Sequence, residues 1–138
     1  MEFEEDDEVI TTYIEETSER LDDIEDTLLG IHRVKGQECE TLLNGIFRGA
    51  HSIKAGANLL NLKDIESVSH SMENVLHFFR QHRLLPDEDA VTVLLSGIDG
   101  IRSLLGDIRG GNKSKVAPPI VRSIVESLNA LLGQLNKT

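Results

Sequence analysis

Apolar residues recur at spacings of three and four along five segments of the chain, which is the periodicity of an amphipathic helix. No run of useful length alternates between apolar and polar residues, as a half-buried strand would. The aromatic residues are four Phe, one Tyr and no Trp, so aliphatic side chains must fill the core. This pattern predicts an all-α fold, with helices over residues 7–33, 38–60, 63–82, 86–109 and 118–136.

The connections between the expected helices are short and carry turn residues. Gly36 is expected to supply a left-handed cap residue after the first helix, and Asn61 after the second, because both tolerate a positive φ. Pro86 is expected in the first turn of the fourth helix, where proline is accepted. Short connections make neighbouring helices antiparallel, and we therefore expect an up-down four-helix bundle with an additional fifth helix.

A stretch of linker composition, residues 110–117, separates the fifth helix from the other four. Residues 1–138 are expected to form a single domain, with the bundle core at 7–109. The fifth helix could cap the bundle or begin a connection to another domain. In the first and fifth helices the residues expected to face inward are Val9, Tyr13, Ile14, Leu21, Ile24, Leu28, Ile31, Ile120, Ile124, Leu128, Leu131 and Leu135.

Charge and composition exclude several classes of partner. The formal net charge is -10 and the cationic residues do not cluster, which argues against nucleic acid and against an anionic membrane surface. No apolar stretch approaches the roughly 18 residues that a membrane helix needs, and the N-terminus is acidic where a signal peptide would be basic. Cys39 is the only cysteine, so no intramolecular disulfide can form, which fits a reducing cytosol. We therefore expect a cytoplasmic protein.

The second expected helix carries a histidine beside its buried face. His51 follows Ala50 and lies about 100° around the helix axis from it. Its ring should therefore reach solvent while its stem is partly packed. The residues that share this flank are Asn44, Phe47, Arg48, Lys54, Ala55 and Asn58.

This combination of residues suits a histidine that carries a phosphoryl group. Neutral imidazole is a good nucleophile near pH 7, because its unperturbed pKa is about 6.5. A cation such as Lys54 beside the attacking nitrogen would offset charge on the incoming phosphoryl oxygens. Ala55, one turn from His51, leaves room for a partner's active site.

The third expected helix offers a carboxylate that could orient the imidazole. His70, Glu73 and His77 are spaced by three and four, so they share one face. If the second and third helices are antiparallel neighbours, Glu73 could meet His51 and fix its tautomer. Two other interpretations stay open at this point: His51 as an ordinary packed or surface histidine, and a metal site formed by Glu73, His70 and His77.

Residues 46–57, with the sequence Ile-Phe-Arg-Gly-Ala-His-Ser-Ile-Lys-Ala-Gly-Ala, resemble the signature of histidine-phosphotransfer domains. The later run His70-Ser71-Met72-Glu73 is similar to the His-x-x-Glu of the N-terminal phosphotransfer domain of chemotaxis-type histidine kinases. The resemblance covers roughly residues 9–109, and the expected helix layout matches it.

The resemblance implies a role for each residue of the cluster. His51 would accept the phosphoryl group through Nε2, Glu73 would hold the other ring nitrogen, and Lys54 and His70 would complete the polar network. Ala55, Asn58 and Asn61 stand where the family commonly has glycine, and none of the three removes a group that the chemistry needs. The expected partner-docking residues are Asn44, Phe47, Arg48, Ala55 and Asn58.

The resemblance also implies that the domain is not an enzyme in its own right. It would be the substrate of a histidine kinase catalytic domain, in cis or in trans, which uses ATP and magnesium, and then the donor to an aspartate of a response-regulator receiver domain. No cofactor or metal would be bound by the domain itself, and a monomer suffices. The alternative is a helical adaptor of the same fold that only binds partners.

Overall fold

The computed structural model describes residues 4–110 and 118–137, and within these ranges it contains helices and no strand. This confirms the all-α prediction. The helices are α1 (Glu4–Gly30), α2 (Gln37–Leu59), α3 (Lys63–His82), α4 (Glu88–Arg109) and α5 (Pro118–Asn136), with one short 3-10 turn, η1 (Ile31–Arg33), after α1.

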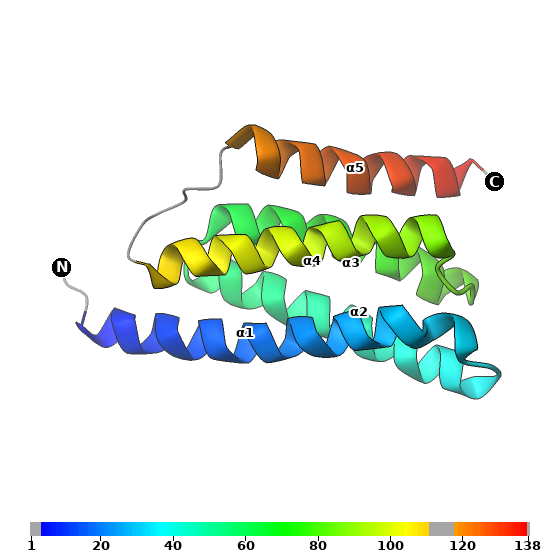
Figure 1. Ribbon diagram of the computed structural model, residues 1–138, viewed down its shortest axis with the longest axis horizontal. Helices are drawn as coiled ribbons and strands as arrows, with labels where there is room; N and C mark the ends of the chain where they lie inside the picture. Colours follow the sequence, from blue (N-terminus) through cyan, green and yellow to red (C-terminus); the bar gives the residue numbers. More distant parts are fainter. Residues whose placement is uncertain (1–3, 111–117, 138) are drawn as a thin grey trace.

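Successive helices run in opposite directions, and the first four form the up-down bundle that short connections predict (Figure 1). Helix α1 packs against α2 and α4, and α3 packs against the same two helices from the other side. Helix α5 lies on the outside of α3 and α4. The fifth helix thus covers one side of the bundle. Of the expected linker only Gly110 is described; residues 111–117 lie outside the described residues.

The core is aliphatic, as the scarcity of aromatic residues predicts. Leu21, Leu94 and Leu128 have no exposed surface, and they come from α1, α4 and α5 respectively. Burying each such side chain stabilises the fold by about 1.5–3 kcal/mol relative to leaving it exposed. One hydrophobic cluster therefore joins the four-helix bundle and α5.

Two residues expected in the core are exposed instead. Val9 is 52% exposed and lines an open hollow of about 370 Å³ between α1 and the end of α2. Ile120 is 54% exposed. Its neighbour Val121 takes the buried place, so the inward stripe of α5 begins one residue later than expected.

Two glycines of α4 allow close packing of the helices on either side. A Cβ at Gly97 would meet Met72 Sδ at 2.8 Å, and one at Gly100 would meet Ile124 Cδ1 at 2.6 Å. Real Cβ atoms do not approach so closely, so a larger residue at either position would displace the end of the Met72 or Ile124 side chain. Met72 directly precedes Glu73, so this contact lies beside the α3 segment that carries the candidate site.

The helix boundaries confirm one turn prediction and correct two. Asn61 follows α2 with a φ of 62°, as expected for a residue that ends a helix in the left-handed region. Gly36 does have a positive φ of 71°, but it is the N-cap of α2 and not the cap of the first helix, because α1 already ends at Gly30 and η1 follows it. Pro86 lies before helix α4, since Asp87 is the N-cap and accepts a hydrogen bond from Ala90 N at 2.8 Å.

An ion cluster joins α1 to α4 on the surface. Arg102 of α4 reaches Asp22 Oδ1 at 2.7 Å and Glu25 Oε1 at 2.6 Å, both in α1. Asp99 Oδ1 lies 3.7 Å from the same guanidinium. We refer to these four residues as the Arg102 network.

Among the described residues, no helix is long and apolar enough to cross a membrane.

Candidate functional site

His51 lies in the middle of α2, on the flank of its buried face. Ala50 and Ile53, on either side of it, are each only 1% exposed and anchor the helix to the core. The His51 side chain itself is 56% exposed. The predicted position, with a packed stem and a solvent-accessible ring, is confirmed.

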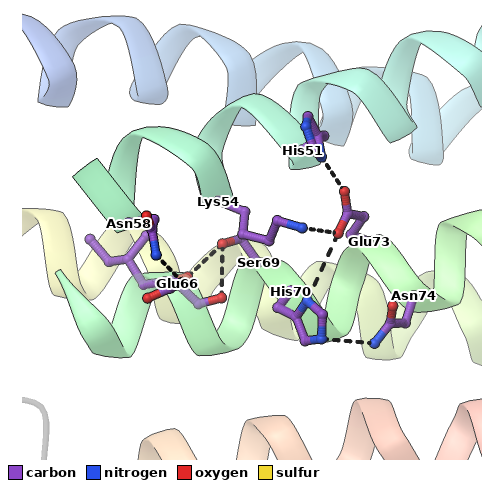
Figure 2. A network of polar contacts seen from close by, with 9 residues as sticks. His51, Lys54, Asn58, Glu66, Ser69, His70, Glu73 and Asn74 are labelled. Carbon is purple, nitrogen blue, oxygen red and sulfur yellow. Dashed lines mark hydrogen bonds and ion pairs between the residues drawn. The ribbon is translucent and has the colours of Figure 1, made fainter. Parts of the chain in front are cut away.

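Glu73 of α3 faces His51 across the contact between the two helices (Figure 2). His51 Nδ1 and Glu73 Oε2 are hydrogen-bonded, which is the contact that the antiparallel arrangement made feasible. An ionised carboxylate can only accept, so Nδ1 carries the proton. The lone pair of the neutral ring is then on Nε2, the nitrogen on the opposite side of the ring from Glu73.

Lys54 engages the second oxygen of the same carboxylate. Its Nζ donates to Glu73 Oε1 at 2.6 Å, and both donors come from α2, three residues apart. The sequence interpretation placed this cation beside the attacking nitrogen; in the structure its ammonium is held on Glu73. We refer to His51, Lys54 and Glu73 as the Glu73 network.

The Glu73 carboxylate is nearly removed from water, with a side-chain exposure of 10%. Burial raises the pKa of this group, but the hydrogen bonds and positive charge of Lys54 and the hydrogen bond from His51 outweigh burial, so the pKa of Glu73 is held below its ordinary value. Glu73 is therefore charged at neutral pH. A buried, charged acceptor with two fixed donors selects one tautomer and one orientation of His51.

Of the other two members of the predicted α3 face, His70 lies at the edge of this network (Figure 2) and His77 lies outside it. His70 is exposed, and its Nδ1 is 3.9 Å from Glu73 Oε1, while its Nε2 lies 3.4 Å from Asn74 Nδ2. His77 packs against Phe47, with ring centroids 5.8 Å apart. The part of the chain that the structure describes contains no group of three His, Cys, Asp or Glu residues that could hold a metal ion, so the geometry gives the metal-site alternative no support.

The expected docking residues differ in how available they are. Arg48 and Ala55 are exposed, and Asn44 is half-buried. Asn58 Nδ2 donates to Glu66 Oε2 at 2.7 Å, so its amide is engaged with α3. Phe47 is half-buried beside His51. Their role in docking stays a prediction.

Sequence reasoning missed one residue of this region. Arg80, in the last turn of α3, places its Cζ 3.8 Å from the centre of the Phe47 ring. It lies seven residues after Glu73, two helical turns along the same face. That spacing is visible in the sequence, but nothing in it indicates that Phe47 lies opposite.

Comparisons with known proteins agree with this geometry. The sequence matches the family described as "Hpt domain" over residues 8–109. It is 32% identical over 124 residues to a chemotaxis protein CheA of Rhizobium meliloti, covering 90% of this chain and 16% of that protein. It is 35% identical over 95 residues to the sensor histidine kinase CheAY of Helicobacter pylori, covering 67% of this chain and 12% of that protein.

A solved structure shares the fold. The phosphorylated P1 domain of CheA3, crystallised in complex with CheY6 from R. sphaeroides, superimposes with a TM-score of 0.79 at 21% sequence identity. The match covers 94% of this chain and 98% of that one. The chain thus spans a whole solved P1 domain but less than a fifth of the length of the two curated relatives.

Proposed function

The chain belongs to the Hpt domain family, and from that premise we propose that it accepts a phosphoryl group on His51 Nε2 and passes it to another protein. As an Hpt domain it is a phosphotransfer module and a kinase substrate, not a catalytic enzyme. The donor we propose is a histidine kinase catalytic domain, which would hold ATP and magnesium. The acceptor is an aspartate of a response-regulator receiver domain. Since ATP supplies the phosphoryl group, the relay would operate in the cytoplasm.

One observation carries this proposal. The Glu73 carboxylate accepts the Nδ1 proton of a half-exposed histidine. An ordinary surface histidine is solvated by water, so it does not need a buried, charged carboxylate as its partner. For a nucleophile the arrangement has a clear use, because it supplies Nε2 with its lone pair and stabilises the positive charge that the ring gains as it attacks.

The proposed forward step forms one bond and breaks one. The Nε2 lone pair attacks the γ-phosphorus of ATP, the bond from that phosphorus to the bridging oxygen breaks, and ADP leaves with the electron pair. Nδ1 keeps its proton, held by Glu73. Lys54 fixes the second carboxylate oxygen, so Glu73 does not turn away as charge develops.

The onward step reverses this chemistry on a different partner. A carboxylate oxygen of the receiver aspartate attacks the same phosphorus, the bond to Nε2 breaks, and the electron pair returns to the ring. The solved complex between a phosphorylated P1 domain and CheY6 supports a protein acceptor of this kind. The exposed residues around His51, Arg48 and Ala55 among them, are the docking surface we propose, and a monomer presents it fully.

The test is direct. The domain would be incubated with ATP, magnesium and a chemotaxis-type kinase catalytic core, beside His51→Gln, and its intact mass and the stability of the modification measured. We expect one phosphoryl group on the wild type only, lost in acid and retained in base, as for a phosphoramidate. No gain with any of several kinase cores, or a gain that survives His51→Gln, would favour the adaptor alternative.

A further inference from the structure

Phe47 lies beside both the candidate nucleophile and a cation of the neighbouring helix. It precedes His51 by one turn of α2, and the two rings are 6.4 Å apart between centroids with planes 17° from parallel. Arg80 of α3 places its guanidinium carbon 3.8 Å from the centre of the Phe47 ring. Arg80 of α3 and His51 of α2 therefore both lie against the Phe47 ring.

The hydrogen bond to Glu73 leaves one property of His51 undetermined. It fixes the position of Nδ1, but the terminal torsion of histidine is broad, and a single bond to one ring atom does not fix the plane of the ring. Offset aromatic pairs are favourable at centroid distances of about 4.5–7 Å. The near-parallel face of Phe47 is thus a second constraint, and it acts on the ring plane.

Phe47 can provide that constraint only if its own ring is held. The ring is half-buried and lies where α2 meets α3. Arg80 covers one face of it, an arrangement in which a cation and an aromatic ring attract each other. His77 packs beside the same ring at 5.8 Å, and its Nδ1 lies 3.4 Å from Arg80 Nη2.

We propose that Arg80 is a positioning residue for phosphoryl transfer, acting through Phe47 on the plane of the His51 imidazole. The inference rests on the proposed function, because the ring plane matters only if the Nε2 lone pair must point at an incoming phosphorus. Reacting atoms must be held within a narrow range of orientation to reach the transition state. Glu73 sets the tautomer, and the Arg80–Phe47 pair sets the direction of the lone pair.

The experiment is a double-mutant cycle with Arg80→Ala, Phe47→Leu and the combined variant. Arg122→Ala, an exposed arginine of α5, controls for the loss of one positive charge. Proton NMR would record the through-space contact between the rings of residues 47 and 51 and the ring-current shift of the His51 protons. The initial rate of phosphoryl gain from a kinase core would be measured in parallel, with urea unfolding of every variant.

For Arg80→Ala we expect a weakened contact between the two rings and a rate about two- to fivefold lower, the factor that corresponds to an exposed cation–π contact. Arg122→Ala should match the wild type. In the Phe47→Leu background, Arg80→Ala should cause no further loss, because the two residues act in series.

An unchanged ring contact in Arg80→Ala would overturn the inference, as would additive rate losses in the cycle or a rate loss matched by the loss of stability. The NMR readout needs no phosphorylation. A wild type that takes up no phosphoryl group from any of several kinase cores would therefore refute the proposed function, while the effect of Arg80 on the ring plane would still be measured.

Discussion

Two charged networks connect neighbouring helices of this bundle, and they differ in which of their groups is removed from water. In the Glu73 network the central carboxylate is 10% exposed and its two donors share its two oxygens. In the Arg102 network the central guanidinium is 35% exposed, and its partner Asp22 is 67% exposed. Both networks join helices. Only in the Glu73 network is the central charge so little exposed to water that its partner side chains must solvate it.

The comparison distinguishes an ion cluster that only stabilises the fold, the Arg102 network, from one that also orients a reactive side chain, the Glu73 network. Exposed ion pairs contribute about 0.2–1 kcal/mol, since water solvates either charge when the pair separates. A buried carboxylate loses that alternative, so removal of a donor leaves it unsatisfied. The Arg102 network can therefore be lost at small cost, whereas loss of Lys54 or His51 leaves the buried Glu73 carboxylate without one of its donors.

The largest effect is expected when the centre of the Glu73 network loses its charge. Glu73→Gln keeps the shape of the side chain but removes the charge that balances the positive imidazole, and we expect the rate of phosphoryl gain by His51 to fall about 100-fold. Intact-mass measurement of initial rates checks this. Glu126→Gln, the same change at an exposed position of α5, should stay within about twofold; equal losses in both variants would contradict the assignment.

A smaller effect is expected from removing the donor that does not react. Lys54→Met leaves Glu73 Oε1 without its donor at 2.6 Å, and we expect the free energy of unfolding to fall by about 1–2 kcal/mol and the rate about tenfold. The pKa of Glu73 should rise, because burial stays while its main opposing contribution goes. Urea unfolding and a carbon-NMR titration of Glu73 measure both; an unchanged pKa would show that Lys54 does not stabilise the charge.

The pH dependence of stability provides a third comparison of the two networks. The folded-state pKa of Glu73 lies below its unfolded value, so its contribution is present at neutral pH and is lost as the pH falls through the folded-state pKa. The stability difference between the wild type and Glu73→Gln should therefore shrink on acidification below about pH 4. Urea midpoints along a pH series test this, and a constant difference would mean that Glu73 titrates alike in both states.

The smallest effect is expected at the other network. Arg102→Met should lower the free energy of unfolding by at most about 1 kcal/mol and leave the rate of phosphoryl gain within about twofold of the wild type. The stability difference should diminish in about 1 M salt, where the screening length is about 3 Å. If Arg102→Met slowed phosphoryl gain as much as Lys54→Met, the contrast between the two networks would be wrong.

The sequence predicted those parts of the site that depend on the face of a single helix. The period of three and four places His51 beside Ala50 and puts His70, Glu73 and His77 on one side of α3, and the structure agrees. The contact between His51 and Glu73 needed an assumption about neighbouring helices, which turn length justified. The end of α2 shortly before Asn61 followed from the tolerance of Asn for positive φ.

The parts that sequence reasoning did not predict depend on what lies opposite a side chain. Arg80 covers Phe47, and Arg102 contacts Asp22, 80 residues away; periodicity within one helix contains no information on either pairing. Val9 and Ile120 are apolar residues at helical spacing, yet both are exposed. Helix length and lateral position, which come from the whole packing, decide such cases.

The pairing of Glu73 with His51 also records the lengthwise alignment of α2 and α3. A displacement of α3 by one turn, about 5.4 Å, would bring the level of His70 or His77 opposite His51 and leave it facing an imidazole in place of a carboxylate. Helix α5, packed on the outer side of α3, and Gly97, which seats Met72 against α4, resist such sliding from the side remote from the nucleophile. A bundle in which α3 was displaced by one turn would thus lose the contact between His51 and Glu73, and with it the proposed phosphoryl transfer.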